Sequence, residues 1–236
     1  MSVFEDYKFV PSEFSGVVRL FPIPNFVLFP HVMQPLHVFE PRYRDLLEDA
    51  MQSDRLIAPA ILAPGWEADY DGCPRLRPYA CLGKVAISQP LGDGTHNLLL
   101  AGLRRVRLLE ELPPRKTYRE ARVMVCEDIY PPNQADERQE LKRNLYDYLS
   151  RLLPRLPQGR EQMELLLNSR ITLGVLTDVL SYSLELSQAD RETLLSEANV
   201  HRRAELLLGH LADVERGGQY TATSGLVCFP PEFSPN

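Results

Sequence analysis

The stretch from Leu20 to Met51, LFPIPNFVLFPHVMQPLHVFEPRYRDLLEDAM, holds the strongest structural signals in this sequence. Its first half consists of short apolar runs that are interrupted by four prolines, Pro22, Pro24, Pro30 and Pro35. Proline fixes φ and has no backbone N–H group, so it is confined to strand starts, strand edges and turns. The runs therefore predict short strands that are separated by turns.

The pattern changes at Pro41. From there on apolar side chains recur at helical spacing, at Tyr43, Leu46, Leu47, Ala50 and Met51. Proline is well tolerated at the first position of a helix because the N–H group there has no partner within the helix. The sequence therefore predicts a helix over Pro41–Met51.

The rest of the first half predicts β-structure around a loop at residues 64–78. Asp93-Gly94 is a strong signal for a hairpin turn. Further strands are expected at Leu56–Leu62, Ala80–Ser88, Asn97–Gly102, Arg104–Glu110 and Tyr118–Cys126.

The second half predicts helices, and Pro131-Pro132-Asn133 marks its start, with Asn133 as a possible cap. An apolar stripe that begins at Leu141 predicts a helix that Pro154 and Pro157 end. The other expected helical segments are Glu161–Asn168, Thr172–Leu186, Gln188–Ala198 after a Ser187 cap, and Val200–Arg216 after an Asn199 cap. The order of elements indicates an α+β protein.

The composition excludes several classes of protein. The 236 residues are 44% hydrophobic and carry a net charge of −6, which makes general binding to phosphate backbones unfavourable. Residues 1–7 lack the pattern of a secretory signal, so a cytoplasmic location is expected. The four cysteines and five histidines are scattered without metal-ligand spacing, and neither a metal nor a cofactor is expected.

Three blocks of the sequence resemble the amino-terminal domain of Lon proteases. The first is the stretch quoted above, with Phe29-Pro30-His31 and Glu40-Pro41-Arg42-Tyr43 as its most specific parts. The second runs from Leu82 through Asp93-Gly94 to Arg107, and the third is the helical region from Leu176 to Leu207. The resemblance covers roughly residues 17–215.

This resemblance implies a PUA-like antiparallel β-barrel subdomain at residues 1–130 and an α-helical bundle at 131–216. Residues 217–236 are expected to form a flexible tail. The resemblance also implies that the chain binds unfolded or degron-bearing polypeptides. Our first hypothesis adds that it delivers them as an adaptor to Lon or to another ATP-dependent protease or a chaperone.

Enzyme activity is not expected. The only Gly-Lys pair, Gly83-Lys84, lies in a predicted strand and lacks the Gly-x-x-x-x-Gly-Lys-Ser/Thr pattern of a phosphate-binding loop. The lysines lie outside any sequence that looks like the catalytic Ser-Lys pair of Lon. The 236 residues therefore predict neither ATP hydrolysis nor peptide hydrolysis.

Six residues are candidates for contact with a bound polypeptide, in a groove that is expected between the two halves: Phe26, Pro30, Met33, Trp66, Tyr70 and Arg104. Aromatic and methionine side chains adapt to varied apolar sequences. Each candidate also has a structural interpretation. Phe29 and Met33 can pack in the core, Trp66 can equally cover the barrel as a lid, and Arg104 can have a structural role at the strand turn.

RNA binding by a PUA-like barrel is the alternative function. Arg104, Arg105 and Arg107 form the densest basic cluster, and arginine binds phosphate well. However, no aromatic residues are interleaved with these arginines, and Glu110 and Glu111 follow directly. Polypeptide binding is therefore the first hypothesis.

Overall fold

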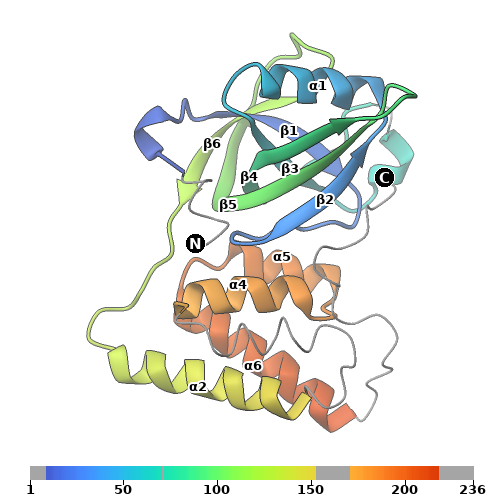
Figure 1. Ribbon diagram of the computed structural model, residues 1–236. Helices are drawn as coiled ribbons and strands as arrows, with labels where there is room; N and C mark the ends of the chain where they lie inside the picture. The colour runs from blue at the N-terminus through green and yellow to red at the C-terminus, as the bar shows by residue number, and fades with distance from the viewer. Residues whose placement is uncertain (1–8, 71, 153–170, 218–236) are drawn as a thin grey trace. The chain divides into compact units, whose positions relative to one another are not determined.

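The computed structural model describes residues 9–70, 72–152 and 171–217. Contacts divide the chain after Cys126 into two units, whose described residues are 9–126 and 127–217. The first unit contains the strands and the second contains only helices (Figure 1). Each unit is described by itself below.

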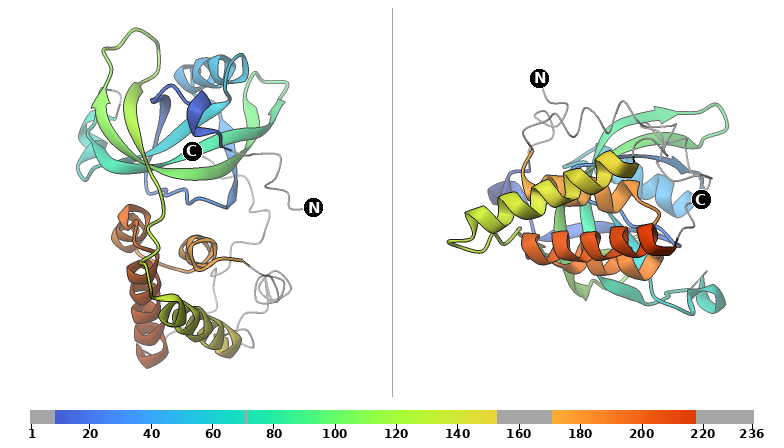
Figure 2. Two further views of the ribbon diagram at one scale, coloured as in Figure 1. Left: turned by 90° about the vertical axis from the view of Figure 1, so that its left-hand side faces the viewer. Right: turned by 90° about the horizontal axis from the view of Figure 1, so that it is seen from below.

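The first unit is a closed barrel. Its strands are β1 (Val17–Ile23), β3 (Leu56–Leu62), β4 (Leu76–Pro90), β5 (His96–Glu111) and β6 (Glu120–Cys126). They pair in the order β5-β4-β3-β1-β6, and β6 pairs with β5 again, which closes the sheet on itself (Figure 2). The first part of β5 also pairs with the short strand β2 (Met33–Val38).

One pair of strands departs from the predicted antiparallel arrangement. β1 and β3 run parallel, with Arg19 opposite Ile57, whereas the other pairs among the described strands are antiparallel. Parallel neighbours need a long crossover connection. The residues between β1 and β3 provide it, because they contain β2 and the helix α1 (Pro41–Met51). The barrel is therefore mixed.

The core of the barrel consists of aliphatic side chains from every barrel strand. All seven residues of β3 are buried, and Leu20, Leu82 and Val106 are 0% exposed. The half-buried Phe9 and Phe14 pack against this core from the segment before β1, which includes the short 3-10 helix η2 (Pro11–Glu13). Burial of this apolar surface stabilises the barrel at about 25 cal/mol per Å².

Helix α1 lies across one end of the barrel (Figures 1 and 2). Its bounds, Pro41–Met51, confirm the prediction from the sequence. Tyr43, Leu46, Leu47 and Ala50 are the side chains that it buries. The helix therefore packs through the apolar stripe that the spacing of these residues indicates.

The strands differ from the prediction mainly in length. The two strands expected at Asn97–Gly102 and Arg104–Glu110 form the single strand β5, which shifts register between Leu108 and Glu110. The loop expected at residues 64–78 is shorter, because it contains the 3-10 helix η3 (Trp66–Asp69) and the start of β4. The hairpin turn at Asp93-Gly94 is confirmed.

The second unit contains four described helices, α2 (Ala135–Leu152), α4 (Leu173–Ser183), α5 (Gln188–Ser196) and α6 (Val200–Gly217). The predicted caps at Ser187 and Asn199 are confirmed, since the Ser187 Oγ accepts from the Asp190 N–H and Asn199 Oδ1 accepts from the His201 N–H. Asn133 instead has a left-handed backbone (φ 61°), and α2 begins two residues later.

A buried arginine connects these helices to the segment that precedes them. Arg203 of α6 is 0% exposed and donates two hydrogen bonds, of 2.9 and 3.0 Å, to the carboxylate of Asp128. Arg203 Nε also donates to Thr177 Oγ1 and lies 3.4 Å from the buried Asp178. Residues 127–130 therefore belong with the helices, although Pro131-Pro132 indicates that the helical half begins only after them.

Some expectations concern residues outside the described ranges. They are the end of the first helix at Pro154 and Pro157, the helix at Glu161–Asn168, and the tail after residue 217. Within the described ranges, no helix has the length and apolar character that a membrane span requires.

Candidate functional site

A pocket in the barrel unit is bounded on one side by the start of α1. Because Pro41 begins the helix, Arg42 and Tyr43 lie in its first turn. The Tyr43 ring is buried and its hydroxyl donates to the Pro22 carbonyl over 3.3 Å. The Arg42 guanidinium lies 5.0 Å from the centre of the Tyr43 ring and 5.3 Å from that of Tyr70. The arginine therefore joins two aromatic rings through cation–π contacts.

The segment around η3 forms the second side. The Tyr70 hydroxyl donates to Glu40 over 2.9 Å, and the same carboxylate pairs with Arg42 at 2.7 Å. Trp66 packs edge-on against the Tyr70 ring with 5.5 Å between the ring centres. This arrangement fixes the Tyr70 ring relative to the helix.

The loop between β5 and β6 forms the third side. Tyr118 donates a short hydrogen bond to Asp49 of α1, and Lys116 donates to Asp49 over 2.9 Å and to Glu120 over 3.2 Å. Arg119 forms a two-pronged pair with Glu111, at 2.7 and 2.8 Å, and donates to the Pro74 carbonyl. The loop is thereby held against both the helix and the segment after η3.

These three sides enclose a cavity of about 290 Å³. That volume is at the lower end of the range for pockets that hold small molecules, which suits part of a chain better than a large ligand. The described residues that line it are mainly tyrosines, cations and prolines: Tyr43, Tyr70, Tyr118, Arg42, Lys116, Arg119, Pro22, Pro74 and Pro114. The exposed Cys73 also lines it.

Three groups at this pocket, Asp49, Tyr70 and Lys116, have pKa values that keep them in their ordinary charge states at neutral pH. The hydrogen bond from Tyr118, with those from Lys116 and Arg19, holds the pKa of Asp49 well below its usual range. Burial raises the pKa of Tyr70, and its hydrogen bond to Glu40 adds to this effect. The hydrogen bonds with Tyr118 and Asp49 raise the pKa of Lys116. At neutral pH the tyrosines are therefore neutral donors and the lysine is charged.

Of the six candidates from the sequence, the structure brings Trp66 and Tyr70 to this pocket. Tyr70 lines it directly, and Trp66 supports Tyr70 from outside the lining. The other four lie elsewhere in the barrel unit. Pro30 and Met33 are buried, and Phe26 is half-buried beside Asn25, which has a left-handed backbone (φ 52°).

Arg104 contributes to packing in the barrel unit. Its guanidinium lies 5.7 Å from the centre of the Phe9 ring, and Nη1 donates to the Leu103 carbonyl. Arg105 is 3% exposed, so within the basic cluster only Arg107 is exposed. Two expectations stay predictions. They are the groove between the two halves and a binding role for Phe26, Pro30, Met33 and Arg104.

The sequence interpretation missed the loop before β6. Residues 113–119 combine two prolines, three cations and a tyrosine in the connection between two strands. Such a composition in a loop is a signal for binding, because loops carry function more often than strands do. The contribution of this loop depends on its position beside α1, which the local sequence does not specify.

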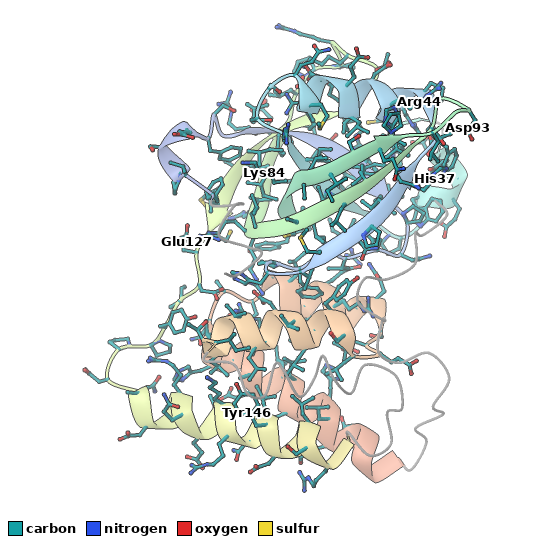
Figure 3. The ribbon with its side chains drawn as sticks, viewed as in Figure 1. His37, Arg44, Lys84, Asp93, Glu127 and Tyr146 are labelled. Carbon is teal, nitrogen blue, oxygen red and sulfur yellow. The ribbon has the colours of Figure 1, made fainter. Side chains whose placement is uncertain are left out.

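A second polar cluster lies at the turn between β4 and β5, where Figure 3 shows Arg44 of α1 beside Asp93. Arg44 donates to the Gly94 carbonyl over 3.2 Å, and His37 of β2 shares a hydrogen bond of 2.9 Å with Asn97 of β5. The first contact holds the hairpin against α1, and the second joins β2 to β5. Among the described residues, no group of His, Cys, Asp or Glu side chains has the arrangement of a metal site.

Comparison with known proteins identifies the family. The family model of the ATP-dependent protease La (LON) substrate-binding domain matches residues 17–213. The chain belongs to this family. The fold agrees, because a crystal structure of a Lon N-terminal domain protein from Xanthomonas campestris superposes with a TM-score of 0.58 at 26% identity. That match covers 82% of this chain and 97% of the Xanthomonas chain.

A second solved structure and two curated relatives extend the comparison. The N-terminal domain of a Mycobacterium avium complex Lon protease has the same fold, with a TM-score of 0.62 at 18% identity over 84% of this chain and 98% of that one. Lon protease of Cytophaga hutchinsonii is 22% identical over 86% of this chain. Lon protease 2 of Desulfotalea psychrophila is 28% identical over 85% of it. The chain spans about a quarter of the length of these two relatives (25% and 26%).

Proposed function

We propose that this protein binds segments of unfolded or degron-bearing polypeptides in the pocket formed by α1, the η3 segment and the loop before β6. The observation that supports this proposal is the tyrosine-lined and proline-lined cavity in a chain of the Lon substrate-binding family. Rings that are fixed before binding present apolar surface at a low cost in conformational entropy.

The proposed role is non-catalytic within these 236 residues. The matched family is that of the substrate-binding domain, and the pattern of a phosphate-binding loop does not occur in the sequence. Bound polypeptides would then be passed to a separate ATP-dependent protease or a chaperone. Addition of the purified chain to a Lon protease should increase the rate at which the protease degrades a polypeptide that the chain binds. A decreased rate would contradict the adaptor role.

The single tryptophan gives a direct test of binding. Trp66 contacts Tyr70, so its fluorescence reports on the pocket. Titration with a tryptophan-free polypeptide, reduced and alkylated so that it cannot fold, should change this fluorescence saturably. The folded form of the same polypeptide should leave it unchanged. Equal responses to both forms would contradict the proposal.

Two substitutions test whether the polypeptide binds at the pocket. Tyr70→Leu removes a lining ring, and Tyr79→Leu removes a half-buried tyrosine on β4 that does not line the pocket. Tyr70→Leu should weaken binding by about tenfold, which corresponds to about 1.4 kcal/mol. Tyr79→Leu should leave the affinity unchanged. An equal loss of affinity in both variants would place the binding surface elsewhere.

A further inference from the structure

The arginines that line the pocket retain hydrogen-bond donors. Arg42 has five N–H groups, and its hydrogen-bond partners are the Glu40 carboxylate and the Tyr70 hydroxyl. Lys116 uses its three N–H groups, since its hydrogen-bond partners are Asp49, Glu120 and Tyr118. Arg119 has five N–H groups and uses three of them. A ligand that supplies acceptors would satisfy these groups.

Two carbonyl acceptors in the same lining already hold a hydrogen bond. The carbonyl of Pro22 accepts from Tyr43 and that of Pro74 accepts from Arg119. The hydroxyl of Thr117 donates to Asp45 over 2.7 Å, and no carboxylate is among the described residues that line the cavity. A ligand N–H group would therefore find no carboxylate acceptor in the described lining, and at these two carbonyls it would share the oxygen with a donor of the protein.

The charge of the pocket does not favour an anion. Carboxylates lie directly against the lining cations, with Glu40 at 2.7 Å from Arg42, Asp49 at 2.9 Å from Lys116, and Glu111 at 2.6 Å from Arg119. An anionic ligand would be attracted by each cation and repelled by the carboxylate beside it. Because each cation is already paired with a carboxylate, it attracts an anionic ligand less strongly than an unpaired cation would, and a neutral ligand with acceptors fits.

Proline meets these requirements. It has no backbone N–H group, its carbonyl is an acceptor, and its ring packs on aromatic rings. Grooves lined with aromatic rings hold proline-containing segments in the extended polyproline conformation. We propose that the pocket takes a proline-containing, uncharged segment of an extended polypeptide. This inference rests on the proposed function and names the class of segment that the same pocket selects.

Cys73 reports on occupancy of the pocket. It is exposed and lines the cavity, so a bound segment should shield its thiol from an alkylating reagent. The rate of alkylation at Cys73 is measured by mass spectrometry of the peptide that contains it, which separates it from the other cysteines. Three capped peptides serve as probes: a neutral proline-containing peptide, the same peptide with alanine at each proline, and the proline peptide with added glutamates.

The proline peptide should slow the alkylation of Cys73 at a concentration at least about tenfold below that needed with the alanine peptide. Protection should be lost in Tyr70→Leu and retained in Tyr70→Phe, which keeps the ring, and in the control Tyr79→Leu. Stronger or equal protection by the alanine peptide or by the glutamate peptide would overturn the inference, as would the absence of protection by the proline peptide.

The unfolded polypeptide used above separates this inference from the proposed function. If it shields Cys73 and the proline peptide does not, polypeptide binding at the pocket holds and the selection for proline is wrong. If neither shields Cys73, both the selection for proline and the use of this pocket are wrong.

Discussion

The carbonyl oxygen of Phe29 lies 2.0 Å from the position that a Cβ atom on Gly102 would occupy. The segment that follows Phe29 is hydrogen-bonded to the same glycine, since the His31 N–H donates to the Gly102 carbonyl over 2.9 Å and the Gly102 N–H donates to Val32 over 2.8 Å. His31 has a left-handed backbone here (φ 64°). The Phe-Pro-His turn therefore lies directly on β5, and only glycine leaves room for it.

Gly102→Ala should destabilise the barrel by about 1–3 kcal/mol, because a backbone carbonyl cannot move aside as a flexible side chain can. Gly92→Ala is the matched control, since a Cβ atom there has nothing within 4 Å. Its free energy of unfolding should stay within about 0.5 kcal/mol of the parent value. Denaturant unfolding of both variants measures the difference, and equal stabilities would contradict the close approach.

Arg203→Met should lower the stability of the helical unit by about 3–5 kcal/mol, because it leaves the carboxylate of Asp128 and the buried Asp178 without their cation. The neighbouring Arg202 has a side chain that is 73% exposed, so Arg202→Met serves as the control and should have little effect. Thermal unfolding followed by circular dichroism compares the two variants. A similar melting temperature for both would show that the buried pair contributes little.

Asp49 should make the barrel sensitive to acid. Its pKa is lower in the folded protein than the ordinary value of about 3.9, so its contribution to stability is complete above about pH 5. That contribution is lost as the pH falls through the ordinary value toward the lower folded value. In Asp49→Asn the free energy of unfolding should therefore fall less steeply between about pH 5 and pH 2 than in the parent.

Tyr118→Phe provides an independent check of the same group, because Tyr118 donates the hydrogen bond that contributes most to the lowered pKa. Its acid dependence should lie between those of the parent and Asp49→Asn. A variant as acid-sensitive as the parent would exclude the Tyr118 hydrogen bond as the cause.

Salt should affect polypeptide binding only weakly. The cations in the pocket already have carboxylate partners, so binding of a neutral segment releases few counterions. Between 50 and 200 mM salt the affinity should change by less than about threefold. The affinity for a nucleic acid that makes several phosphate contacts would fall about 10³-fold or more over this range. If RNA binds with such a salt dependence and polypeptide does not bind, the alternative function is favoured.

Much of the local structure could be predicted. Pro41 and the apolar residues after it define α1, and the capping residues Ser187 and Asn199 define the starts of α5 and α6. These signals act between residues a few positions apart, so they are readable from the chain alone. The three Lon-like motifs occur in a specific order, and this order indicated the family that the family model confirms.

The pocket could be predicted only in part. Trp66 and Tyr70 are aromatic residues in a polar loop, a setting that indicates binding, whereas Arg42 and Tyr118 have no local feature that separates them from packing residues. Arg203 lies on the buried face of α6 with Ala204 and Leu207, and a charged residue on an apolar face is a signal that the sequence does contain. Its partner Asp128 is 75 residues away and has no such signal.

The sequence by itself determined the positions of most helices and strands, the α+β class and the family, because turn residues, caps and periodicity act over short distances. Tertiary structure decided the parallel pairing of β1 with β3, the burial of Arg203 with its carboxylates, and the pocket. Arg42, Tyr70 and Lys116 come from three separate segments and meet only when the barrel closes. Long-range contacts of this kind depend on the packing of whole elements, which no short stretch of sequence specifies.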